Sequence, residues 1–167
     1  GLSNAPEFII VKNLDDGTKN WNVYPTILGN NYLELNKDNT SAFSGVSYFN
    51  NTAPTTTVFS VNSAGSTNAS GEDFIAYSFH SVEGYSKAGT YVGGGSSYLP
   101  FVHTGFRPAF VLLRVTSTSN AWFIYDNKRE GYNEANDTLS PNYNTVEDST
   151  YKLDLVSNGF KIRSTQN

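Results

Sequence analysis

The sequence predicts an all-β protein, an antiparallel β-sandwich or jelly-roll-like fold, and three observations lead to this prediction. Aromatic residues make up 14% of the chain and charged residues only 16%. About a third of the residues are Ser, Thr or Asn, which favour turns, whereas residues that favour helices are scarce. Short runs rich in β-branched and aromatic residues recur between turn residues, as they do in sandwiches.

Ten short strands are expected from these runs. They span residues 8–12, 21–24, 32–35, 57–61, 74–80, 89–92, 109–115, 121–125, 150–156 and 160–163. The last two flank Asn158-Gly159, a dipeptide that accepts positive φ, and therefore predict a β-hairpin. One segment, residues 129–136, has helical character, but it is too short to form a stable helix alone.

The chain also repeats itself. Residues 6–12 and 108–114 both start with Pro, continue as an apolar run and end on a basic residue. Three further matches follow in the same order: 20–24 with 121–125, 33–36 with 139–142, and 58–61 with 159–162. The same 38 positions separate the Trp from the Phe in both series. Four ordered matches with this spacing predict a duplication with a period near 101 residues.

Two related copies of roughly 100 residues are therefore expected, the first in residues 1–82 and the second in residues 83–167. The first copy lacks its N-terminal hairpin, the counterpart of residues 83–104, and the second lacks its final strand, the counterpart of residues 74–80. Two explanations stay open: the chain is an excerpt of a longer repeat protein, or its subunits form oligomers that cover each other's open edges. Because open sheet edges invite strand addition, copies of the chain itself are expected partners. Matched residues should form equivalent cores: Phe8, Ile10, Trp21 and Phe59 in one copy, Phe110, Leu112, Trp122 and Phe160 in the other.

The repeated strings resemble a repeat domain of unknown function that is found in structural proteins of tailed bacteriophages, especially those of marine bacteria. The strings lie at residues 6–12, 20–21, 33–36, 68–71, 74–77, 83–87, 104–108 and 157–160. The resemblance covers nearly the whole chain and implies a lectin-like β-sandwich in a tail-fibre, tail-tip or other virion-surface protein. One departure is that Asp126-x-x-Arg129 in the second copy has no counterpart in the first.

Composition argues against several classes of protein. The net charge of −4 and the pI near 5.0 are unfavourable for binding nucleic acid, which requires a basic face. The chain contains no cysteine, so disulfides and thiolate metal sites are excluded. No apolar stretch approaches the length of a membrane span, so membrane insertion is not expected.

No catalytic site is expected, and the chain is predicted not to be an enzyme. His80 and His103 lie in unrelated contexts, and a nucleophile–base pair requires converging groups. Acidic doublets occur at Asp15-Asp16, Glu72-Asp73 and Glu147-Asp148. Neighbours on a strand point to opposite faces, so such doublets are poor acid–base pairs. No cofactor and no metal are expected, with calcium bound by Asp and Asn loops as the open alternative.

Five tyrosines are the candidates for ligand contact, because tyrosine offers contact area and a hydroxyl at low entropic cost. They are Tyr85, Tyr91, Tyr98, Tyr132 and Tyr143. Structural roles are expected for Trp21 and Trp122 as core anchors, with sugar stacking as the alternative. Asp126 and Arg129 are expected to form an internal salt bridge, with a ligand-facing pair as the alternative.

The leading functional prediction, which rests on the resemblance, is a non-enzymatic bacteriophage virion-surface or tail-fibre structural module. Its expected partners are copies of itself, other virion proteins and a host-surface glycan, and its expected location is the virion surface, outside the cell. Two alternatives stay open: a secreted bacterial adhesin or extracellular filament subunit, and a carbohydrate-active enzyme.

Overall fold

The computed structural model describes residues 2–38, 43–95 and 97–164. These residues form antiparallel strands with only two short α-helices, which confirms the prediction of an all-β fold. No helix in these ranges has the length and apolarity that crossing a bilayer requires. The chain divides into two compact units: unit 1 comprises Gly1–Ser81 and Thr116–Ser119, and unit 2 comprises Val82–Val115 and Asn120–Asn167.

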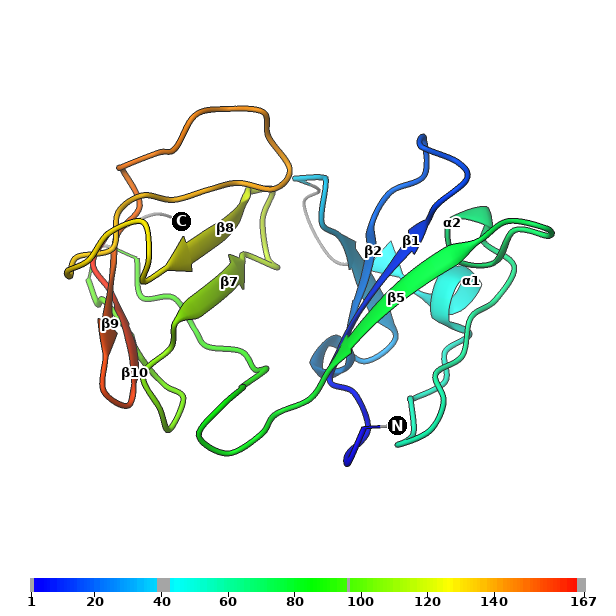
Figure 1. Ribbon diagram of the computed structural model, residues 1–167, viewed down its shortest axis with the longest axis horizontal. Coiled ribbons are helices and arrows are strands. Elements are labelled where there is room, and N and C mark those ends of the chain that lie inside the picture. The colour runs from blue at the N-terminus through cyan, green and yellow to red at the C-terminus, as the bar shows by residue number, and fades with distance from the viewer. Residues whose placement is uncertain (1, 39–42, 96, 165–167) are drawn as a thin grey trace. The chain divides into compact units, whose positions relative to one another are not determined.

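Unit 1 is built on a five-stranded antiparallel sheet of order β4-β3-β2-β1-β5 (Figure 1). The strands are β1 (Phe8–Asn13), β2 (Asn22–Pro25), β3 (Asn31–Glu34), β4 (Phe43–Ser44) and β5 (Phe74–Phe79). A 3₁₀ turn, η1 (Thr26–Leu28), follows β2, and the helices α1 (Val46–Phe49) and α2 (Gly65–Asn68) lie between β4 and β5 in the chain.

The core of unit 1 lies between one face of this sheet and α1. Its buried members come from β1, β2, β3 and α1: Ile9, Val11, Tyr24, Tyr32 and Phe49. The rings of Tyr24 and Phe49 stack with their centroids 4.8 Å apart. Side chains of this size contribute about 1.5–3 kcal/mol each when they are buried, so the cluster fixes the face of the sheet on which the helix packs.

Two buried asparagines attach α2 to the sheet of unit 1. Asn13, at the end of β1, donates its Nδ2 to the carbonyl of Gly65 at 3.1 Å. Asn22, at the start of β2, donates its Nδ2 to the carbonyl of Ser66 at 3.2 Å. Hydrogen bonds to the carbonyls of the first two α2 residues offset part of the cost of removing these amides from water.

Unit 2 contains two smaller antiparallel sheets (Figure 1). One pairs β7 (Phe110–Arg114) with β8 (Trp122–Asp126), and the other has the order β6-β10-β9, with β6 (Phe101–His103), β9 (Leu153–Val156) and β10 (Gly159–Ile162). Both sheets supply side chains to one buried cluster: Val111, Ala121, Phe123, Tyr125, Ala135, Leu153, Leu155 and Phe160. The hairpin predicted at Asn158-Gly159 is the β9–β10 hairpin.

The first hairpins of the two units share one register. The matching residue pairs are Ile9–Tyr24 and Ile10–Val23 in unit 1, and Val111–Tyr125 and Leu112–Ile124 in unit 2. The next segment of chain continues the match, because Val23 pairs with Leu33 and Ile124 pairs with Leu139. These two pairs span 10 and 15 positions, so the connection in unit 2 is 5 residues longer.

The predicted core residues of the first strands were on the wrong face. Ile9 and Val111 are buried, whereas Phe8 and Ile10 are half-buried and Phe110 is 58% exposed. Both strands are apolar on successive residues, so alternation could not identify the inner face. Trp122 and Phe160 are buried as expected, and Trp21 and Phe59 are half-buried.

Three predicted elements do not form within the described residues. Residues 57–61 contain no strand, although Phe59 packs against the core of unit 1. Residues 89–92 contain no strand either, and the predicted helix at 129–136 is a series of turns and bends. β-propensity alone does not make a strand where no neighbouring strand offers hydrogen bonds.

Candidate functional site

The tyrosines predicted to contact a ligand all belong to unit 2, and all are exposed, from 41% for Tyr91 to 89% for Tyr132. Tyr91 differs from the others because its ring meets that of Phe160 edge-on, with centroids 6.2 Å apart. Burial of its hydroxyl raises the pKa of Tyr91 above the usual tyrosine range. Tyr132 lines one depression of unit 2 and Tyr143 lines another, so these two are placed beside hollows that a ligand could enter.

The loop formed by residues 127–137 carries most of the first depression, and an ion-pair network fixes its start. Asp126 Oδ1 accepts the backbone N–H groups of Lys128 and Arg129 at 2.8 and 3.0 Å. Arg129 Nε lies 2.6 Å from Asp126 Oδ2, and Arg129 Nη1 lies 2.7 Å from Glu147 Oε1. These bonds hold the pKa of Asp126 below its usual range, with the hydrogen bond from Arg129 as the largest cause.

The far end of the 127–137 loop is held by side chains that bond to backbone. Asn133 Nδ2 donates to the carbonyl of Leu155 at 3.1 Å, and its Oδ1 accepts the N–H of Leu155 at 2.9 Å. The amide of Asn133 thus bonds to β9 as the backbone of a neighbouring strand would. Glu130 Oε2 accepts the N–H of Asn136 at 2.5 Å. The loop is therefore an ordered structure built on the unit 2 core.

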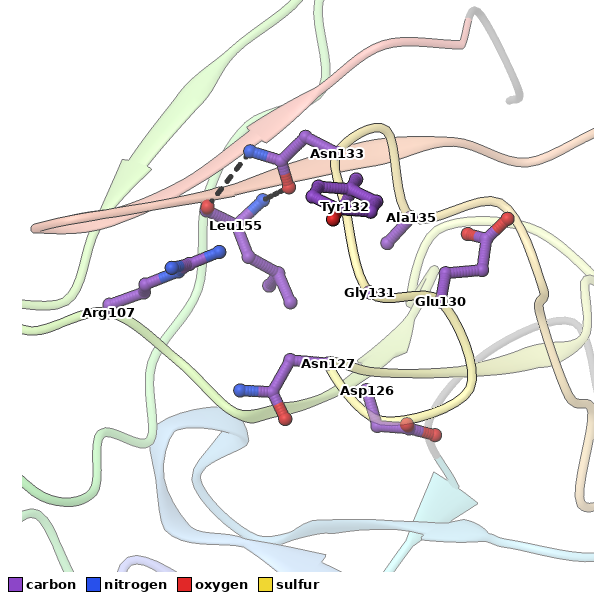
Figure 2. Close-up of a pocket in the computed structure, with 9 residues that line it drawn as sticks. All are labelled: Arg107, Asp126, Asn127, Glu130, Gly131, Tyr132, Asn133, Ala135 and Leu155. Atoms are coloured by element: carbon purple, nitrogen blue, oxygen red, sulfur yellow. Dashed lines mark hydrogen bonds between the residues drawn. The ribbon is translucent and has the colours of Figure 1, made fainter.

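The first depression is a small polar pocket of about 120 Å³ (Figure 2). The residues that line it are Arg107, Asp126, Asn127, Glu130, Gly131, Tyr132, Asn133, Ala135 and Leu155. Figure 2 shows the side chains of Arg107 and Leu155 pointing toward its middle and the carboxylates of Asp126 and Glu130 pointing outward. Because both carboxylates are occupied by bonds of the loop itself, the pocket offers a guanidinium and amide groups to a ligand.

The second depression of unit 2 is a wider groove of about 420 Å³. Aromatic and polar side chains line it together: Ala121, Phe123, Ser140, Tyr143, Thr145, Val146, Glu147, Asp148, Ser149 and Tyr151. Phe123 and Tyr151 pack with their ring centroids 4.5 Å apart, while Tyr143 remains 47% exposed. Exposed aromatic area beside hydroxyls and carboxylates suits a polyhydroxylated ligand, which presents apolar C–H faces and many O–H groups.

The histidines and acidic doublets are engaged in local contacts. His80 Nδ1 lies 2.8 Å from the carbonyl of Ser81, and His103 lies beside Phe101 in β6. Of the doublets, Asp16 accepts the N–H of Thr18 at 2.8 Å. In residues 2–38, 43–95 and 97–164, no group of three or more His, Asp or Glu side chains has the arrangement that a metal ion needs.

The two tryptophans occupy matching places at the starts of the second strands. Trp122 opens β8 and is 2% exposed, with the guanidinium carbon of Arg114 5.8 Å from its ring centroid. Trp21 immediately precedes β2 and is half-buried.

Sequence reasoning assigned no role to one pair of asparagines that the structure places in matching contacts. Asn36 Oδ1 accepts the backbone N–H of Trp21 at 3.0 Å, and Asn142 Oδ1 accepts that of Trp122 at 3.0 Å. These asparagines occupy the same position in the two matched segments of the sequence. Their signal was the recurrence of Asn at the last position of the match between residues 33–36 and 139–142.

Comparison with known proteins identifies the family to which the chain belongs. No match was found among curated proteins or among solved structures. One family model matches residues 1–167. Since that match spans the whole chain, the protein belongs to the family described as Domain of unknown function (DUF7483).

Proposed function

We propose that this chain is a non-enzymatic structural module of a bacteriophage virion surface, of the tail-fibre type, that contacts a host-cell glycan. In this proposal the two units are copies of one β-sandwich repeat, and unit 2 carries the binding surface. The observation that most supports a repeated structural module is the shared register of the two first hairpins, extended by the Val23–Leu33 and Ile124–Leu139 pairs.

The case for two copies rests on the matching first hairpins, one further matching residue pair and one matching side-chain bond. Chance similarity could align two hairpins, but it would not also place an asparagine on the backbone N–H of each tryptophan. A repeated scaffold suits a protein whose task is to build length and surface, because each copy adds the same unit to the array. The virion location itself comes from the resemblance of the repeated strings.

The case for ligand contact rests on how unit 2 departs from unit 1. The longer connection between Ile124 and Leu139 supplies the 127–137 loop, and an ion-pair network orders it. Binding residues are commonly placed on loops that a rigid scaffold positions. The groove beside Tyr143 combines exposed aromatic area with hydroxyl groups, which are the features that carbohydrate recognition uses.

A glycan array probed with the full chain tests this function. The expected result is selective binding that Tyr143→Ala weakens at least about tenfold, the loss expected for a contact worth about 1.4 kcal/mol. Val146→Ala is the matched control, because Val146 lines the same groove and is 89% exposed but offers neither a ring nor a hydroxyl. Equal binding by both variants, or no binding to any glycan, would count against a glycan ligand in this groove.

Two further measurements separate the proposal from its alternatives. An antibody raised against the chain should label phage particles in electron microscopy; labelling of bacterial cell-surface filaments alone would identify an adhesin. Incubation with the glycans bound in the array should release no shorter products. Turnover that a single Asp or Glu substitution abolishes would identify a carbohydrate-active enzyme.

A further inference from the structure

β7 offers one edge to β8 and directs its other edge away from that strand. Within residues 2–38, 43–95 and 97–164, β7 pairs with β8 alone. Its counterpart in unit 1, β1, has a strand on each side, β2 and β5. β7 reads Phe-Val-Leu-Leu-Arg and contains no Pro, and its only charged residue is the last, Arg114. Natural proteins usually protect such an edge with charges, prolines or bulges.

Unit 1 shows which kind of strand this edge accepts. β5 reads Phe-Ile-Ala-Tyr-Ser-Phe and pairs antiparallel with β1 over six residues, from Phe8–Phe79 to Asn13–Phe74. The rings of Phe8 and Phe79 lie with their centroids 6.3 Å apart. Phe110 holds the place of Phe8 in unit 2 and is 58% exposed. In unit 1 that place is partly covered by a β5 side chain.

The hydrogen-bond phase of the two strands also agrees. Just beyond the end of β1, Leu14 donates its N–H to the carbonyl of Asp73 at 2.8 Å. In this register the even-numbered residues Phe8 and Ile10 direct their backbone groups to β5. In β7, Asn127 donates its N–H to the carbonyl of Ala109 at 3.0 Å, so odd-numbered residues bond toward β8. Phe110 and Leu112 consequently direct their N–H and C=O groups to the open edge.

We propose that the open edge of β7 binds, antiparallel and in the β1–β5 register, an extended uncharged strand with the residue pattern of β5. The occupant is thus a β5-type strand of a further repeat of this type. The inference rests on the proposed structural function, since it states how one module joins the next. The main-chain bonds supply affinity, and a ring at the place of Phe79 covers Phe110, as in other cases of β-strand addition.

A labelled synthetic peptide with the sequence of residues 72–83 is the probe, and anisotropy with the full chain reports binding. In the proposed register the N–H of Tyr77 points at β7 and that of Ala76 points away. N-methylation at Tyr77 should therefore weaken binding at least about tenfold, by removing one hydrogen bond and inserting a methyl group between the strands. N-methylation at Ala76 should leave binding unchanged and is the matched control.

Amide hydrogen exchange of the chain gives the register directly. On peptide binding, the amides of Phe110 and Leu112 should become protected, while those of Val111 and Leu113, which face β8, should change little. Phe110→Lys should weaken binding, because a charge would be placed at the new strand pair, whereas Val146→Lys should not.

The inference would be overturned by no saturable binding of the peptide, by equal weakening by the two N-methyl groups, or by protection of amides elsewhere. Copies of the chain that associate with one another give a further test, in which the two N-methylated peptides compete for the contact. If both peptides blocked self-association equally, a second copy would be using a different register, and the inference would be overturned. Failure of the glycan array or of virion labelling would leave these peptide results standing, so the two proposals fail separately.

Discussion

Asn142 Oδ1 accepts the backbone N–H of Trp122 at 3.0 Å, and Asn142 lies just beyond the 127–137 loop in the chain. Because Trp122 is buried, its amide has no access to water and needs this acceptor. The bond therefore ties the end of the loop to the start of β8, and Asn36 makes the same bond for Trp21 in unit 1.

Asn142→Ala should lower the free energy of unfolding by about 1–2 kcal/mol, because a buried N–H loses its partner. Urea titration followed by tryptophan fluorescence measures the change. Asn144→Ala is the matched control, since Asn144 is exposed two positions away and should alter stability by less than about 0.5 kcal/mol. Similar losses in both variants would show that the bond to Trp122 does not stabilise the fold.

The two faces of the β7–β8 hairpin should differ sharply in their response to truncation. Phe123 belongs to the unit 2 core and is 7% exposed, whereas Phe110 is 58% exposed. Phe123→Ala should cost about 3–5 kcal/mol and Phe110→Ala less than about 1 kcal/mol. Thermal unfolding followed by circular dichroism compares the two variants. The reverse order would restore the face assignment that the sequence suggested.

The sequence was sufficient for the fold class but not for the sheet faces. Turn residues and aromatic runs marked eight of the strands to within a few residues. The strands β1 and β7, however, each begin with four successive apolar residues, so residues on both faces satisfy the pattern of a core strand. Which face meets the helix or the second sheet depends on packing partners that come from distant segments, such as Phe49 and Leu153.

The candidate site shows the same division between local and distant information. The Asp126–Arg129 contact could be anticipated because the residues are three positions apart and a turn brings them together. The bond from Arg129 to Glu147 could not, since it joins segments 18 positions apart whose loop conformation no pattern specifies. Asn133 likewise bonds to β9 only because the folded loop returns to that strand.

Arg129→Met should loosen the 127–137 loop while leaving the hairpin intact. The substitution retains much of the side-chain volume but removes the bonds to Asp126 and Glu147. A stability loss of about 1–2 kcal/mol is expected from this partly buried network. Hydrogen exchange should speed up at Lys128 and in the loop and not in β9–β10. Lys128→Met is the control, because Lys128 is exposed. Unchanged exchange in the loop would contradict the assignment of Arg129 as its anchor.

Acid should weaken unit 2 through Asp126. The hydrogen bond from Arg129 holds the folded-state pKa of Asp126 below its usual value, which is about 3.9 in an unfolded chain. Since the folded state binds this proton less readily than the unfolded state, the stabilisation is fully present above about pH 4. It is lost as the pH falls through the folded-state pKa.

Asp126→Asn removes the titrating group, so it should reduce stability at pH 7 and make unfolding less dependent on pH between about 2 and 5. Asp148→Asn is the comparison, because the side-chain hydrogen bond and then the backbone hydrogen bond from Thr150 lower the pKa of Asp148, with no arginine among the causes. Urea midpoints across this pH range measure both slopes. If Asp126→Asn kept the slope of the parent chain, the Arg129 pairing would have no share in acid sensitivity.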